Sequence, residues 1–375
     1  MIEDRAGGRA GAPRCATVSP MPAAEIEHTA RTLGISTEAA ELALSSDFID
    51  LHIDTFIPYR LVRYDVLDRH DSGWFGGRFF GHADLPRMTA GGLTGGMWSI
   101  TTNPFRPARN RWHVFQRNLA RLRTIVARSR GRMQFVRTAA EYRRARAAGA
   151  HAVMLSIQGG NALEAAPGEV AAVPDRLLTR VTLVHLTNSV YGASSTPLAA
   201  RVRRDHGLTA RGKRLVEQLD ASRVFVDLAH IHPQSFWDAV AAHDPSLPLI
   251  DTHTGVKAVC DCWRNLDDDQ IKAIADTGGV IGIMFHRAFL EPGGGPCTGA
   301  RVVDHMQHII DLVGDDFVAV GTDYDGAVVP PTDLVSADAL PRLVQHMLDR
   351  GWSDERIRKV LGTNYLRALA ALRPE

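Results

Sequence analysis

The feature that most constrains the fold of this 375-residue chain is the repeated alternation of short apolar segments with longer amphipathic ones. Most of the apolar segments are continuously hydrophobic, which is typical of strands in a parallel sheet covered on both faces. The segments between them show the 3.6-residue periodicity of helices. The expected strands are 48–54, 94–101, 152–158, 180–187, 224–230, 247–253, 279–285 and 317–323. The expected helices are 114–129, 139–148, 208–220, 233–242, 267–277, 301–312, 337–350 and 353–372.

Eight such units favour an α/β fold in which the strands close into a (β/α)8 barrel of TIM type. An open, doubly wound sheet is the alternative. It is disfavoured because the chain lacks a G-x-G-x-x-G turn after the first strand. Residues 133–136 form a further apolar patch that predicts an extra strand outside this count.

Three parts of the chain differ in composition. Residues 1–20 are rich in Gly, Arg, Ala and Pro, and we expect them to be disordered. Residues 21–45 predict an N-terminal extension of two helices, 23–33 and 37–45, packed on the barrel. The barrel itself is expected to span 46–375, with a long insertion after strand 1.

The carboxyl ends of the expected strands carry many histidines and aspartates. His52 and Asp54 end the first strand two residues apart, so their side chains point to one face. In a barrel of this type, residues from different strands meet at the carboxyl end. Imidazole and carboxylate groups that meet there are typical ligands of Zn²⁺ and similar ions, so the pattern favours a metal site. The other polar residues at strand ends are Gln158, Asn161, His185, Asp227, His230, His253, Asp323 and Asp325.

Net charge, targeting segments and cysteine content limit the binding partners and the cellular compartment that we expect. The formal net charge of +1 gives no indication of nucleic acid or an anionic membrane as a partner. No signal peptide, membrane span or hydrophobic tail is visible. The four cysteines show no disulfide framework and no C-x-x-C pair, which indicates reduced thiols. We therefore expect a cytoplasmic protein with a small-molecule substrate, and a homodimer remains open.

A series of motifs in register makes the chain resemble the renal (membrane) dipeptidase family of zinc metallopeptidases, which are amidohydrolase-like barrels. The resemblance covers about residues 46–372. The motifs include L-H-I-D, Q-G-G-N, V-D-L-A-H, T-H-T-G, W-R-N-L, G-T-D-Y-D-G and L-G-T-N-Y-L-R-A-L.

This resemblance implies hydrolysis of a small amide, most simply a dipeptide with a free C-terminal carboxylate, by a metal-activated water. It implies that His52 and Asp54 hold one zinc ion and that His230 and His253 hold a second. The residues that match substrate and proton-transfer groups are His185, which polarises the substrate, Arg264, which pairs with its carboxylate, and Asp323, near the scissile bond.

Gln158 departs from the family pattern, because the family has a glutamate there that bridges both ions. Asn161 likewise replaces a histidine, and we expect it to contact the substrate. A neutral amide oxygen is a poor bridge between two cations. We therefore expect one tightly bound zinc ion, held by some of His52, Asp54, His230 and His253, with Gln158 among the metal-site residues. The second ion is expected to be weak or absent.

Two alternatives to a dipeptidase remain open on the sequence. One is a mononuclear amidohydrolase that acts on another C–N bond, and the other is a catalytically silent barrel that binds a ligand. For Arg264 alone, a surface ion pair with residues 267–269 is the simpler interpretation. The insertion 55–90 mixes aromatic and basic residues and predicts a lid or substrate wall, or equally a packed insertion or dimer contact. Those residues are Tyr59, Arg60, Arg63, Tyr64, Arg69, His70, Trp74, Phe75, Arg78, Phe79 and Phe80.

Overall fold

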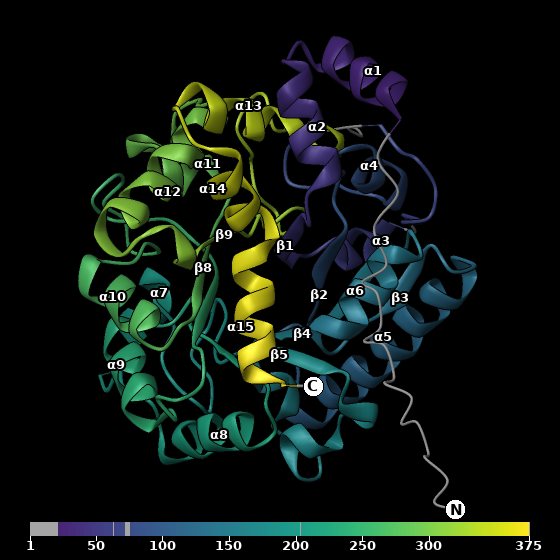
Figure 1. Cartoon of the computed structure of the whole chain (residues 1–375). Helices are drawn as coiled ribbons and strands as arrows, with labels where there is room; N and C mark the ends of the chain where they lie inside the picture. The colour runs from purple at the N-terminus through teal and green to yellow at the C-terminus, as the bar shows by residue number, and fades with distance from the viewer. Residues whose placement is uncertain (1–21, 63, 72–75, 203, 375) are drawn as a thin grey trace, which may run out of the picture.

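Parallel strands form a closed ring at the centre of the molecule (Figure 1). The computed structural model describes residues 22–62, 64–71, 76–202 and 204–374. Around the ring every neighbouring pair is parallel, and β2 pairs with both β1 and β4, which closes the barrel. The strands of the ring are β1 (Ile49–Ile53), β2 (Gly95–Thr101), β4 (His151–Gln158), β5 (Leu178–Thr182), β6 (Phe225–Asp227), β7 (Ile250–Thr254), β8 (Val280–Ile283) and β9 (Val318–Val320). The predicted (β/α)8 barrel is confirmed.

One further strand, β3 (Met133–Phe135), pairs only with β4 among the described residues and lies outside the ring. The extra strand expected at 133–136 is therefore present where the apolar patch indicated it.

Helices surround the ring, and most lie where the periodicity placed them (Figure 1). Helix α9 has the predicted bounds, whereas α5 begins six residues before the expected 114. The helices that follow the strands are α5 (Ala108–Arg128), α6 (Ala139–Ala147), α8 (Ala210–Ala221), α9 (Pro233–Ala242), α10 (Asp268–Asp276), α12 (Gly299–Val313) and α13 (Pro341–Asp349). Short helices that the sequence did not predict are α3 (Phe56–Val62), α4 (Leu85–Ala90), α7 (Pro197–Val202) and α11 (Arg287–Leu290).

The last expected helix, 353–372, is interrupted. Helix α14 (Asp354–Arg358) passes through a π turn (Lys359–Thr363) into α15 (Asn364–Leu372). In this turn Gly362 lies so close to the backbone of Asp47 that a Cβ would come within 2.1 Å of the Asp47 carbonyl oxygen. The Asn364 amide donates to the carbonyl of Val318 at 2.9 Å. The motif L-G-T-N therefore anchors the C-terminal helix to the start of β9.

The interior of the barrel is filled differently at its two ends. Near the amino ends of the strands, residues such as Met154, Phe225 and Ile250 pack with Tyr365 of α15, and all four are fully buried. The Tyr365 hydroxyl lies 3.1 Å from the Met154 sulfur. This apolar cluster closes the amino end, so only the carboxyl end is available for polar chemistry.

Two helices, α1 (Ala23–Leu33) and α2 (Thr37–Ser45), precede the barrel (Figure 1). Helix α2 contacts α13 and is capped by the Ser36 hydroxyl, which accepts from the Ala39 amide at 3.1 Å. The expectation of disorder for 1–20 falls outside the described residues, as do Arg63, Trp74 and Phe75 of the insertion.

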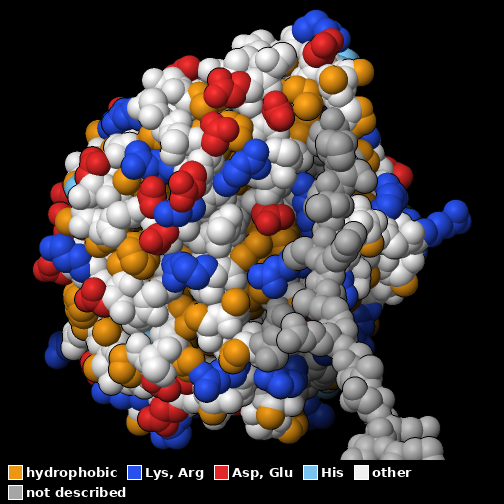
Figure 2. Space-filling model, in the orientation of Figure 1, with side chains coloured by type: hydrophobic (Ala, Val, Ile, Leu, Met, Phe, Trp, Pro, Cys, Tyr) orange, Lys and Arg blue, Asp and Glu red, His pale blue; other side chains and the backbone are white. Residues whose placement is uncertain are grey.

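The surface mixes charges of both signs. In the face shown in Figure 2, Lys and Arg side chains are interspersed with Asp and Glu. Within the described part of the chain, no helix is long and apolar enough to cross a membrane.

Candidate metal centre and active site

The predicted site residues meet at the carboxyl end of the barrel, but several lie just beyond the strands. His185 and His230 were predicted to lie within strands, yet β5 ends at Thr182 and β6 at Asp227. Asp323 was likewise placed on the eighth strand, whereas β9 ends at Val320. His230 and Asp323 adopt positive φ angles of 64° and 59°, a conformation that costs a non-glycine residue about 1–2 kcal/mol. This left-handed turn ends the strand ladder and re-aims the side chains over the barrel.

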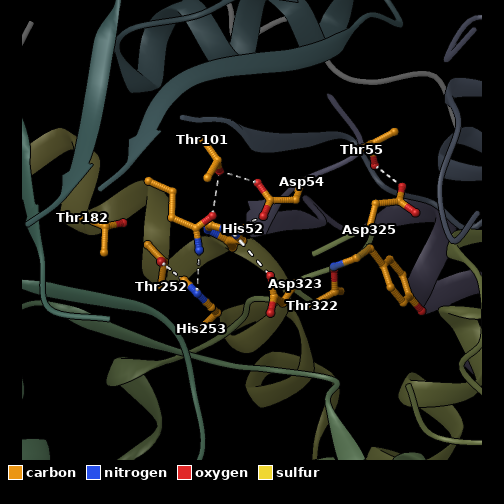
Figure 3. A network of polar contacts seen from close by, with 12 residues as sticks. His52, Asp54, Thr55, Thr101, Thr182, Thr252, His253, Thr322, Asp323 and Asp325 are labelled. Carbon is orange, nitrogen blue, oxygen red and sulfur yellow. Dashed lines mark hydrogen bonds and ion pairs between the residues drawn. The ribbon is translucent and has the colours of Figure 1, made fainter. Parts of the chain in front are cut away.

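Three groups gather around His52 (Figure 3). The Nε2 atom of His52 lies 3.5 Å from an Asp54 oxygen and 3.6 Å from an Asp323 oxygen. Its ring also stacks on the ring of His253, with centroids 3.8 Å apart. Ligand atoms of His52, His253 and Asp323 all lie within 4.8 Å of one another, which by distance alone is close enough to hold one ion. The structure therefore brings together the first and last strands as the sequence predicted.

The carboxamide of Gln158 contacts both His230 and His253. Its Nε2 atom is 3.2 Å from His230 Nε2 and 3.4 Å from His253 Nε2, and these two histidine nitrogens are 2.9 Å apart. On its other side, Gln158 Oε1 accepts from the Thr101 hydroxyl at 2.9 Å. Thr101 also reaches Asp54 at 3.3 Å, so this threonine links the carboxamide to the β1 side of the site.

Asp227 supports the site from below. Its Oδ2 atom accepts from the hydroxyls of Thr182 at 2.5 Å and Thr252 at 2.8 Å, and it forms an ion pair with Arg180 Nη1 at 3.0 Å. Thr252 in turn lies 2.9 Å from His253 Nδ1 (Figure 3). Arg180 donates through Nη2 to His52 Nδ1 at 2.7 Å. One buried carboxylate thus connects to the outer nitrogen of both stacked histidines.

Aspartates also fix the strand ends. Asp50 and Asp251 stand two residues before His52 and His253, and each accepts a hydrogen bond from the amide of that histidine, at 3.0 and 3.3 Å. Burial raises the pKa of both carboxyl groups to about 7. The prediction of site residues missed these two aspartates, although the Asp-x-His spacing that β1 and β7 share is a sequence signal that could have found them.

The electrostatics differ between the two carboxylates nearest His52. Desolvation by burial, followed by repulsion from Asp54, raises the pKa of Asp323 well above its usual range. Burial acts the same way on Asp54, but attraction to His52 outweighs it and lowers the pKa of Asp54. A raised pKa makes Asp323 the stronger proton acceptor of the two.

His185 lies beside this group, with its ring in an edge contact with His230 at a centroid distance of 4.7 Å. Burial lowers its pKa to about 4, so the ring is neutral at pH 7. A neutral imidazole can donate one hydrogen bond without adding a charge.

Arg264 is buried behind His253, with 3% of its surface exposed, and it donates to the His253 carbonyl. The surface ion pair with residues 267–269 is therefore wrong, because Asp267 instead caps α10 and lies 3.6 Å from Lys257. Among the described residues, Arg264 Nε has no hydrogen-bond partner. A buried guanidinium with an unused N–H suits an incoming carboxylate.

Asn161 is buried, and its carbonyl accepts from Arg111 at 2.9 Å. Its side-chain oxygen lies 2.9 Å from where a Cβ on Gly159 would stand, and Gly159 has a φ of 91°. Only glycine fits this turn, which brings Asn161 next to the end of β4.

The insertion after β1 is fastened to the loop after β9. Asp325 accepts from the Thr55 hydroxyl at 2.7 Å (Figure 3). It also accepts from the amides of Gly81 and His82, at 2.8 and 2.9 Å. Arg60 of α3 donates to the Thr101 carbonyl at the end of β2. In its described residues the insertion is therefore packed along the carboxyl end of the barrel.

Comparison with known proteins identifies the family. The model of the membrane dipeptidase family, peptidase family M19, matches residues 36–373. The chain belongs to the membrane dipeptidase family. As a member it is a metal-dependent hydrolase of the dipeptidase type, and zinc is the ion characteristic of the family.

Two named peptidases and one uncharacterized protein are among the relatives of this chain. A metallopeptidase from Rhodobacter sphaeroides, solved with a phosphinate mimic of the dipeptide L-Ala-D-Ala, is 28% identical, with a TM-score of 0.73 over 86% of this chain and 98% of that one. Dipeptidase verJ of Clonostachys rogersoniana is 27% identical over 77% of this chain and 75% of its own length. An uncharacterized Klebsiella pneumoniae protein from the pqqA 5′ region is 30% identical over 68% of this chain and 95% of its own.

Proposed function

We propose that this membrane dipeptidase family member hydrolyses a small dipeptide-like amide with a free C-terminal carboxylate, using one tightly held zinc ion. The observation that carries the proposal is the convergence of three histidines, two aspartates and Gln158 at one end of the barrel.

The hydrogen bonds around His253 support a single zinc ion on the β6–β7 side of the site. Asp227 Oδ2 accepts every donor that faces it, so the single Thr252 proton goes to Asp227, and Thr252 must accept from His253 Nδ1–H. The lone pair of His253 Nε2 is then directed inward, beside His230 Nε2. Rotation of the Gln158 carboxamide would present its oxygen to the same point, and such amide orientations follow their hydrogen-bond partners.

Charge also limits the number of ions. Asp54 and Asp323 supply two negative charges near the histidines, and a single Zn²⁺ balances them. A second ion would leave an excess of positive charge in a buried site, because Gln158 lacks the charge that a glutamate would add.

The chain's own residues provide the remaining functions. A bound zinc ion supplies Lewis acidity and lowers the pKa of water. Asp323 accepts the proton from the attacking water and returns it to the leaving amine. His185 donates to the oxygen of the scissile carbonyl as its negative charge grows. Arg264 binds the substrate carboxylate, and Asn161 lines the same end of the barrel.

Metal analysis combined with a substrate panel tests the proposal. The purified protein should contain about one zinc ion per chain, and chelation should abolish hydrolysis of free dipeptides. Dipeptide amides, which lack the carboxylate, should be poor substrates. A protein that contains no zinc and cleaves no dipeptide would indicate a silent barrel, and one that prefers the amides would indicate a different C–N substrate.

A further inference from the structure

Arg180 is a charged residue inside the barrel that the dipeptidase reaction does not require. It lies in β5, two residues before Thr182 and therefore on the same face of the strand, and it has no solvent-exposed surface. Its Nη1 atom pairs with Asp227 at 3.0 Å and its Nη2 atom lies 2.7 Å from His52 Nδ1. Burying a cation costs free energy unless it is paired, so the groups that Arg180 contacts indicate its role.

The direction of the Arg180–His52 hydrogen bond is fixed by chemistry. A guanidinium has five N–H donors, no acceptor, and stays protonated in proteins. His52 Nδ1 must therefore accept, and the proton of the neutral ring resides on Nε2. His52 Nε2 lies 3.5 Å from an oxygen of Asp54 and 3.6 Å from an oxygen of Asp323, and it makes no hydrogen bond among the described residues.

Distance alone would admit a metal ion beside His52. Two ligand atoms at about 2.1 Å from a tetrahedral Zn²⁺ lie about 3.4 Å apart, close to the separations found here. The proton is what conflicts with an ion, because a ligating nitrogen must offer a lone pair. Metal-bound histidines almost always donate their other N–H, as His253 does to Thr252, whereas His52 accepts there.

We propose that Arg180 takes the place of a first metal ion: it keeps the proton of His52 on Nε2, the nitrogen that faces Asp54 and Asp323, and it places a buried positive charge, paired with Asp227, behind His52. The proposal deepens the proposed function, on which it rests, by confining the single zinc ion to the His230–His253 half. Arg180 acts through His52 and is a positioning residue. It also gives a second reason, independent of Gln158, why two ions do not bind.

Nitrogen NMR of the histidine rings in the unmodified, zinc-loaded protein tests the tautomer of His52 directly. Two buried histidines serve as internal references. His305 accepts at Nδ1 from the Val256 amide and donates from Nε2 to the Leu290 carbonyl. His151 has the opposite tautomer, because Nε2 accepts from Trp98 and Nδ1 donates to the Leu93 carbonyl.

His52, assigned by its loss in His52→Gln, should show the Nε2–H pattern of His305, with no change of tautomer when zinc is removed. His253 should show the Nδ1–H pattern of His151, with its Nε2 signal shifting on zinc removal. A His52 ring with Nε2 bound to zinc would overturn the proposal. A parent protein that holds no zinc but has His52 protonated on Nε2 would instead refute the one-ion hydrolase and leave the assignment of Arg180 standing.

Zinc stoichiometry provides the second measurement. Gln158→Glu should still hold one ion, because Arg180 remains, whereas Gln158→Glu combined with Arg180→Met should hold two. The matched control combines Gln158→Glu with Arg373→Met, which removes a buried guanidinium that donates to backbone carbonyls away from the site. Two ions in Gln158→Glu alone, or one in the Arg180 double variant, would overturn the proposal. The NMR measurement decides the question if that double variant does not fold.

Discussion

His52 and His253 stack face to face across the barrel, yet their outer nitrogens meet opposite partners. On the β7 side, Thr252 accepts from His253 and passes the hydrogen bond on to Asp227. On the β1 side, Arg180 stands between His52 and the same Asp227: it donates to His52 Nδ1 and forms an ion pair with Asp227. The Thr252 hydroxyl can accept a hydrogen bond from His253 Nδ1, whereas the Arg180 guanidinium can only donate one to His52 Nδ1. One carboxylate therefore prepares one histidine to bind a cation and the other to donate a proton.

The largest expected effect is a difference in zinc content and hydrolysis rate between variants of His253 and His52. His253→Gln should lose zinc and slow hydrolysis by about 1,000-fold or more, since about 4 kcal/mol of transition-state stabilisation from the ion disappears. His52→Gln should keep about one zinc ion per chain. Elemental analysis of the two variants side by side measures this, and equal losses of zinc would show that both halves ligate the metal.

The relay to Asp227 gives a smaller effect. Thr252→Val removes the acceptor for His253 Nδ1–H and should weaken zinc binding by about 10- to 100-fold. Thr182→Val is the matched control, because Thr182 also donates to Asp227 but does not contact His253. Competition with a chromophoric chelator gives both affinities. If the control weakened zinc binding as much, the effect would arise from Asp227 and not from the tautomer of His253.

His305, which lies outside the site, has the tautomer proposed for His52 and therefore shows how such a buried histidine behaves without an ion nearby. Burial lowers the pKa of His305 to about 4, whereas an unfolded chain has a value of about 6.5. The unfolded state then binds the proton first, so this contribution to stability is complete above pH 6.5 and is lost as the pH falls towards 4. Between pH 7 and pH 5 the loss should be about 2 kcal/mol.

Urea unfolding of the parent protein and of His305→Gln at both pH values measures the loss as a difference, since other titrating groups are common to the two. Glutamine can both accept from Val256 and donate to Leu290 without titrating. An unchanged pH dependence in His305→Gln would show that the pKa of His305 is the same in the folded and unfolded states.

The smallest effect concerns the residue that lies behind His253. Arg264→Lys keeps the charge but loses the planar fork, and kcat/KM for a free dipeptide should fall about tenfold, or about 1.4 kcal/mol. The value for the corresponding dipeptide amide should change little. If the two substrates were affected equally, Arg264 would act by supporting His253 and not by binding the carboxylate.

The sequence by itself determined the barrel, because continuous apolar runs and helical periodicity leave few other arrangements. Even the extra strand β3 followed from a four-residue apolar patch. It also determined which end of the barrel carries chemistry, since His52, Asp54 and His253 sit at the ends of those runs. The exact ends of the strands were less certain, because the positive φ of His230 and Asp323 is set by neighbouring strands and not by local propensity.

Only the tertiary structure decided how the site residues are connected. For Arg264 alone the sequence favoured a surface ion pair, and its burial behind His253 became visible only with the fold. Arg180 and Thr252 look like ordinary residues within strand segments, since nothing local shows that both reach Asp227. Hydrogen bonds between residues 25 to 128 positions apart depend on how strands are ordered around the ring, so the proton each histidine carries is a property of the closed barrel.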